Sequence, residues 1–71
     1  MTKGLSKAHY EPCVGLPYSV KYWYNNDIYC WELVLVNEKG EEVSEKEVAP
    51  NKAFLKSIIP EFVQKAYELH G

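Results

Sequence analysis

The fold is decided by residues 18–36, which have the sequence YSVKYWYNNDIYCWELVLV. On both sides of Asn25-Asn26, large apolar side chains recur at every second position, and a period of two is typical of β-strands. Asparagine tolerates the positive φ angles that tight turns require. The stretch therefore predicts a β-hairpin that turns at Asn25-Asn26. Because it also holds most of the aromatic residues of the chain, it is the first place to look for both core and function.

A tight turn at Asn25-Asn26 fixes which side chains share a face of the hairpin. It pairs Val20 with Trp31, whereas a shift by one residue would bury Lys21 beside Trp31. The preferred register predicts a front face that a helix covers, made of Tyr18, Val20, Tyr22, Tyr29, Trp31 and Leu33 and continued by Leu35. It predicts a back face made of Lys21, Trp23, Ile28, Cys30, Glu32, Val34 and Val36, joined by Val48.

A second turn follows the hairpin at residues 37–40, which have the sequence NEKG. This pattern predicts a type I turn closed by a left-handed Gly40, and it sets Leu35 opposite Val43. A third strand is then expected at about 41–48. Its residues are mostly Glu and Lys, which is typical of an exposed sheet edge that charge protects from aggregation.

The last segment, from Asn51 to about residue 70, has the period of a helix. Asn51 is a suitable N-cap, and Pro60 in the middle predicts a kink. The apolar stripe consists of Leu55, Ile58, Ile59, Phe62, Ala66 and Leu69. We therefore expect one α+β domain over residues 1–71: a loosely ordered, extended N-terminal arm at 1–16, a three-stranded antiparallel β-meander at 18–48, and one Pro60-kinked C-terminal helix at 51–70, packed on one face.

Size and charge narrow the classes of function. A chain of 71 residues has room for one small core, which is typically worth only ~3–5 kcal/mol. Eight basic residues, all lysine, stand against ten acidic ones, for a net charge of −2. An acidic chain without arginine argues against nucleic-acid binding, where the planar arginine group is favoured. The glutamates gather in a predicted acidic edge: Glu38, Glu41, Glu42, Glu45 and Glu47.

Residues able to carry out chemistry are few and scattered. The thiols and imidazoles number four, at His9, Cys13, Cys30 and His70, but they lack the paired short spacings of zinc sites. No grouping indicates a nucleophile with its base, so we expect no catalytic residue, metal or cofactor. No apolar run is long enough for a membrane span, and the start lacks a signal-peptide pattern, so we expect a cytoplasmic protein. Whether Cys13 and Cys30 ever pair is left open.

The back face is the predicted functional surface, because it carries more apolar side chains than a solvent-facing sheet of this size normally shows. Either the arm folds over it or a partner does, and both can hold in part. We expect a non-enzymatic protein-interaction module that binds another protein or itself as a homodimer. Small inhibitors or accessory subunits encoded by phages and mobile elements have this profile. The predicted interface residues are Trp23, Ile28, Val34, Val36, Lys21 and Glu32.

The alternative is single-stranded nucleic-acid binding. Trp23 would stack a base, Lys21 beside it would meet a phosphate, and other lysines would extend the track. These lysines lie in the arm and the helix: Lys3, Lys7, Lys52 and Lys56. The acidic edge would work against this role, and it would instead steer the protein toward a basic partner surface.

Overall fold

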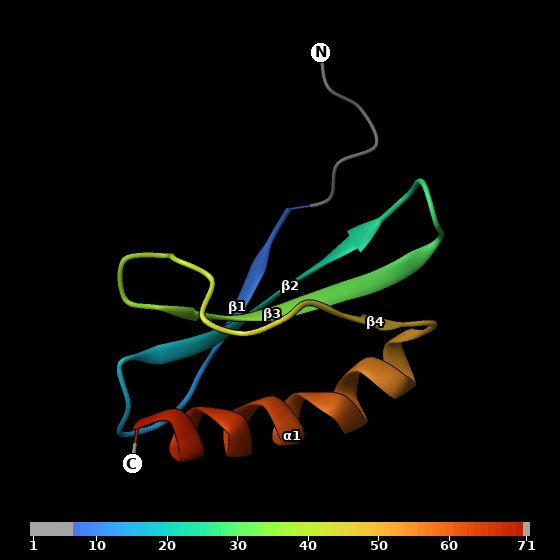
Figure 1. The fold of residues 1–71 in the computed structure, drawn as a ribbon. Coiled ribbons are helices and arrows are strands. Elements are labelled where there is room, and N and C mark those ends of the chain that lie inside the picture. The colour runs from blue at the N-terminus through green and yellow to red at the C-terminus, as the bar shows by residue number, and fades with distance from the viewer. Residues whose placement is uncertain (1–6, 71) are drawn as a thin grey trace.

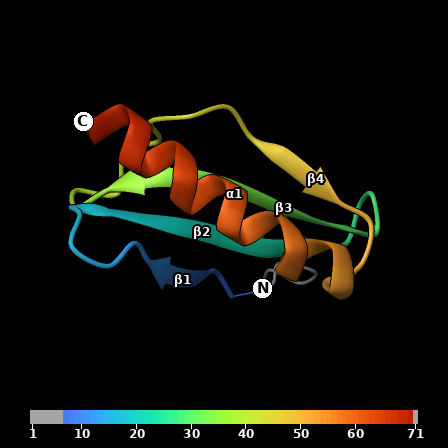
Figure 2. The same ribbon diagram turned by 90° about the horizontal axis from the view of Figure 1, so that it is seen from below.

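The computed structural model describes residues 7–70 and has an α+β fold. A four-stranded antiparallel sheet has its strands in sequence order, and the single helix lies across one of its faces (Figure 1; Figure 2). We call the face under the helix the front face and the opposite one the back face. The elements are β1 (His9–Pro12), β2 (Tyr18–Asn25), β3 (Cys30–Asn37), β4 (Glu47–Ala49) and α1 (Lys52–His70).

The sheet has one strand more than the three predicted, because residues 9–12 of the predicted arm form β1 along the edge of β2. All four residues of β1 are exposed, so no alternation of apolar residues in the sequence predicts the strand. Cys13 N donates to Tyr18 O at 3.0 Å, and in an antiparallel ladder the neighbouring Pro12 then points its backbone away from β2. The missing N–H of Pro12 therefore costs no ladder bond, which is why proline is tolerated at this edge.

The prediction of the β2–β3 hairpin is correct for the faces of its paired residues but wrong for the position of its turn. The turn spans residues 26–29 instead of Asn25-Asn26, and Tyr29 takes the positive φ, at 54°. Val20 consequently pairs with Leu35 and not with Trp31. This shift of four residues is even, so every paired side chain keeps its predicted face. Tyr29 is the exception: it leaves the front face and lies in the turn, 74% exposed.

The second turn has the predicted geometry at its end. Gly40 has a φ of 84°, and its N–H donates to Asn37 O at 2.9 Å. Val43 N donates to Leu35 O at 2.8 Å, in the register predicted for this pair. The third predicted strand, at 41–48, is interrupted, because Leu35 N is bonded by the Ser44 hydroxyl and the regular ladder of β4 starts only afterwards.

Helix α1 covers the front face as predicted. Asn51 Oδ1 accepts a hydrogen bond from Phe54 N at 2.8 Å, which is the geometry of an N-cap. Near the other end, Tyr67 Oη donates to Val14 O at 2.9 Å and ties the helix to the β1–β2 loop. Pro60 lies inside the helix, and the kink stays a prediction. The buried core beneath α1 consists of Cys13, Val20, Leu33, Leu35, Ala49, Leu55, Ile58, Phe62 and Ala66.

Candidate protein-interaction surface

The back face is laid out by the register of the four strands. Lys21 on β2 lies between Tyr10 on β1 and Val34 on β3. One step along, Trp23 lies opposite Glu32 on β3, and Val48 on β4 lies on the other side of Glu32. Because side chains alternate between faces, all these residues point away from α1. The predicted interface residues on β2 and β3 are therefore brought to one face.

Trp23 is the centre of a polar and aromatic cluster on this face. Its indole Nε1 donates to Glu32 Oε1 at 2.9 Å. Two ammonium groups lie over its ring: Lys21 Nζ is 5.6 Å from the ring centroid and Lys46 Nζ is 5.7 Å. Contacts at this distance are in the range of cation–π attraction. The cluster holds the indole in one orientation, half-buried and still partly open to solvent.

Two of the predicted interface residues lie beneath the surface and not on it. Val34 is 0% exposed and Val36 is 1% exposed, although α1 lies on the other face. Val34 lies directly opposite Lys21 on β2, and the aliphatic stems of lysines commonly cover apolar neighbours. A partner would therefore touch Trp23 and the lysines, with the valines as their support.

The sixth predicted interface residue, Ile28, is set apart from the strands. It lies in the turn at residues 26–29 and is 46% exposed. Cys30 begins β3 beside this turn and is half-buried. Ile28 is therefore an exposed apolar side chain at the end of the sheet, and the hydrophobic surface extends around the hairpin tip.

Sequence reasoning missed two residues of this surface, Lys46 and Tyr10. Lys46 was grouped with the glutamates of the edge, yet it is two residues before Val48, so strand alternation alone places both on one face. Tyr10 could not be found in this way, because β1 itself was missed. The arm does not lie over the back face between His9 and Pro12, where it forms β1 beside β2, and Tyr10 is 55% exposed.

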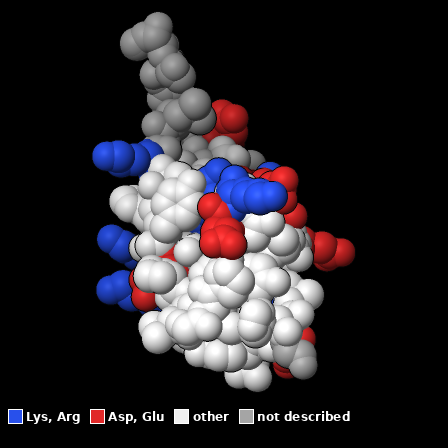
Figure 3. All heavy atoms as spheres, turned by 90° about the vertical axis from the view of Figure 1, so that its left-hand side faces the viewer, with Lys and Arg blue, Asp and Glu red and all other residues white. Residues whose placement is uncertain are grey.

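The predicted acidic edge is an exposed rim. Its five glutamates are all exposed, and they lie in the turn after β3, in the segment that follows and at the start of β4. Viewed from the end of the molecule that carries this turn, acidic and basic side chains mix in the upper part and an uncharged area lies below (Figure 3). Glu45 and Glu47 flank Lys46 in the sequence. Glu47 pairs with Leu33 of the front-face core and Glu45 lines a hollow beside α1, so both lie on the helix side and not beside Trp23.

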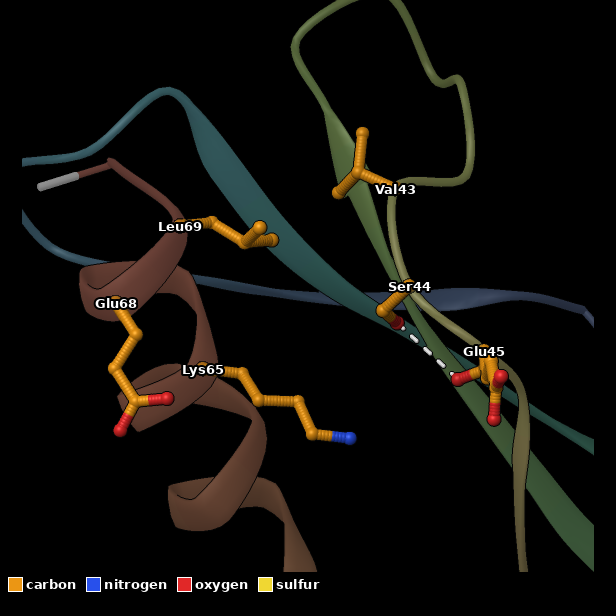
Figure 4. Close-up of a pocket in the computed structure, with 6 residues that line it drawn as sticks. All are labelled: Val43, Ser44, Glu45, Lys65, Glu68 and Leu69. Carbon is orange, nitrogen blue, oxygen red and sulfur yellow. Dashed lines mark hydrogen bonds between the residues drawn. The ribbon is translucent and has the colours of Figure 1, made fainter.

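A hollow of about 330 Å³ opens between α1 and the segment that leads to β4. Its lining residues come from both sides, and Lys65 extends from the helix toward Ser44 and Glu45 (Figure 4). Ser44 Oγ donates to Glu45 O at 3.2 Å, so its hydroxyl hydrogen is already used. The hollow is lined by Val43, Ser44, Glu45, Lys65, Glu68 and Leu69.

The two cysteines are free and lie at opposite ends of β2. Cys13 is bonded through its backbone to Tyr18, and Cys30 pairs with Asn25. Tyr18 and Asn25 are seven positions apart along the strand, which is about 23 Å at ~3.3 Å per residue, far beyond disulfide reach. Burial raises the pKa of the Cys13 thiol, and the negative charge of Glu11 raises it further, so Cys13 is a poor nucleophile at neutral pH.

The other predicted candidates do not gather around Trp23. Lys52 Nζ lies 5.8 Å from the ring centroid of Trp31, and Lys56 lies on α1, so both belong to the helix layer. Lys3 is outside the described residues. Between residues 7 and 70, no group of three or more His, Cys, Asp or Glu side chains could hold a metal ion. Of the lysines in the nucleic-acid alternative, Lys52 and Lys56 therefore lie in the layer opposite Trp23.

Within the same described range, no helix combines the length and the apolar character needed to cross a membrane. Comparisons with protein-family models, with curated proteins and with solved structures give no match to this chain. The case for a function therefore depends on the geometry of the back face.

Proposed function

We propose that this protein is a non-enzymatic binding module that attaches to another protein through the back face of its sheet, with Trp23 at the centre. The observation that carries this proposal is the half-buried indole on the face away from the helix, held by Glu32 and flanked by two lysines. Tryptophan is among the residues that contribute most to protein interfaces, and an indole fixed in advance loses little conformational entropy on binding.

The partner in this proposal is a different protein and not a second copy. A symmetric dimer through the back faces would bring the Trp23 clusters of two copies together. Each cluster carries Lys21 and Lys46, so like charges would face each other at the centre of the contact. Attachment to a larger complex, as an inhibitor or an accessory subunit, is the role that this small surface fits.

The test compares matched serine substitutions on the two sides of the molecule. Tagged wild-type protein, Trp23→Ser and the control Phe54→Ser would each be used to recover partners from the native host. Phe54 lies on α1 and is 46% exposed, so Phe54→Ser removes an aromatic side chain from the opposite layer of the molecule. We expect the same partner with wild type and control, and its loss with Trp23→Ser.

Two further measurements decide whether Trp23 acts in binding or in folding. We expect the free protein to have the mass of a monomer in solution. We expect Trp23→Ser to lower the free energy of unfolding by no more than about 2 kcal/mol, because the indole is only half-buried. The proposal is refuted if the protein is strictly monomeric, Trp23→Ser lowers the free energy of unfolding by several kcal/mol, and the variant still binds the same partners. Trp23 would then be a core residue.

A further inference from the structure

Two positive charges meet over one indole without a negative partner. Lys21 and Lys46 come from different parts of the sheet, and each places its ammonium group within 5.7 Å of the Trp23 ring centroid. Among the described residues neither ammonium forms an ion pair with a carboxylate. Two like charges beside one ring repel each other, and a negative group bound next to them would relieve the repulsion. The free surface therefore lacks the anion that its charges favour.

Glu32 does not fill this role, although it lies beside Trp23. Its Oε1 accepts the indole N–H at 2.9 Å, which orients the ring, and Glu32 makes no ion pair with either lysine. The face is also apolar at its borders, where Tyr10 is 55% exposed and Val48 is 47% exposed. A ligand that fits both features carries a negative group at its middle and apolar side chains around it.

We infer that the back face binds an acidic segment of a partner protein, with its carboxylates paired to Lys21 and Lys46 and neighbouring apolar side chains on Trp23, Tyr10 and Val48. This inference rests on the proposed function and names the chemistry of its partner. Charge complementarity favours this occupant, because Lys21 and Lys46 place two positive charges at the centre of the face.

The same charge pattern disfavours nucleic acid as the occupant. A nucleic-acid strand carries a phosphate on every nucleotide, so its charges extend well beyond the two lysines. On the β4 side they would meet Glu42, which is exposed and pairs with Val36 of the back face. A peptide with one or two carboxylates places its charge only where the lysines are. The observations therefore favour a protein segment.

The test uses the full chain labelled with ¹⁵N and three probes. The first probe is a peptide of alternating glutamate and valine with serine at both ends, the second has glutamine at each glutamate position, and the third is oligodeoxythymidine. The indole N–H signals of the two tryptophans report binding, because Trp23 lies on the back face and Trp31 faces the helix. We expect the acidic peptide to shift the Trp23 signal and leave Trp31 in place.

Variants and salt then identify the charges that matter. We expect the glutamine peptide to bind at least tenfold more weakly, and binding of the acidic peptide to weaken as salt is added. Lys21→Gln and Lys46→Gln should each weaken binding several-fold, and the double variant should abolish it. Lys39→Gln removes an equal charge from the turn at residues 37–40 and should have no effect.

Each contrary result has a definite meaning. If the glutamine peptide binds equally well, or no peptide shifts the Trp23 signal, the acidic-segment inference is wrong. If oligodeoxythymidine binds more tightly than the acidic peptide, with a steep dependence on salt, the occupant is nucleic acid and the inference is likewise overturned. The proposed function fails separately, when Trp23→Ser keeps its partner from the native host. If Trp23→Ser loses its partner but the wild type does not bind acidic peptides, the proposed function stands and only this inference is wrong.

Discussion

The two faces of the sheet are both buried at their centres, but different parts of the chain bury them. On the front face, Val20 is 0% exposed beneath α1 and belongs to a core that extends from Cys13 to Ala66. On the back face, Val34 is equally buried, yet it pairs with Lys21, and the same face carries Trp23 with Lys46 beside its ring. A helix is a fixed cover, whereas lysine side chains are flexible and able to move aside. The front face therefore contributes most to stability, and the back face is the one that we propose contacts a partner.

The largest expected effect is at the centre of the helix cover. Phe62→Ala removes a ring that is 2% exposed, and we expect a loss of about 3–5 kcal/mol, comparable to the whole stability of a domain this small. Urea denaturation followed by circular dichroism would show little or no folded protein. Phe54→Ala, the same change at an exposed site of α1, should retain the folding transition. A cooperative transition in Phe62→Ala close to that of wild type would mean that α1 is not the principal cover.

A smaller expected effect compares the stability that one buried valine contributes on each face of the sheet. Val20→Ala and Val34→Ala delete the same atoms from two residues that are both 0% exposed. We expect about 2 kcal/mol for Val20→Ala, because α1 cannot close the cavity, and about 1 kcal/mol for Val34→Ala, because the lysines and the indole can settle into the space. Free energies of unfolding from urea titrations give the comparison. Equal losses would show that the back face is as rigidly covered as the front.

The smallest expected effect concerns the start of the helix alone. Asn51→Ala removes the side-chain oxygen that accepts the Phe54 N–H, and the loss of an N-cap costs about 1 kcal/mol. Hydrogen exchange should quicken in the first turn of α1, while the indole signal of Trp23 on the back face stays unchanged. A shifted Trp23 signal in Asn51→Ala would show that the two faces are coupled, and that the helix layer and the back face are not independent.

The sequence predicted the elements whose signals are local. The helix follows from the spacing of Leu55, Ile58, Phe62 and Ala66, and its start follows from Asn51. Gly40 marked the second turn correctly. The β2–β3 turn was misplaced because Asn25-Asn26 resembles a two-residue turn, while Asn25 in fact uses its side chain to accept from Asp27 N and pairs with Cys30. β1 was missed because its exposed side chains carry no period and only its backbone pairing defines it.

The face on which the candidate site lies could be predicted from the sequence, but the burial and contacts of its residues could not. Strand alternation brought Lys21, Trp23 and Glu32 to the back face, and the even shift in register left that prediction intact. The burial of Val34 and Val36 could not be foreseen, because it depends on how side chains from separate strands close over them. Alternation with Val48 could have placed Lys46 on the back face, but its contact with Trp23 is made across the sheet and does not follow from the sequence.

The bond between Tyr67 Oη and Val14 O bears on how the chain folds. It joins residues 53 positions apart, whereas every strand pairs only with its neighbour in sequence. Contacts between near neighbours form first, because a short loop loses less entropy on closing than a long one. We therefore expect the β2–β3 hairpin to appear early and the docking of α1 to be the last step. Until that step the front face is open to water, so the slow event in folding is also the one that protects the chain from aggregation.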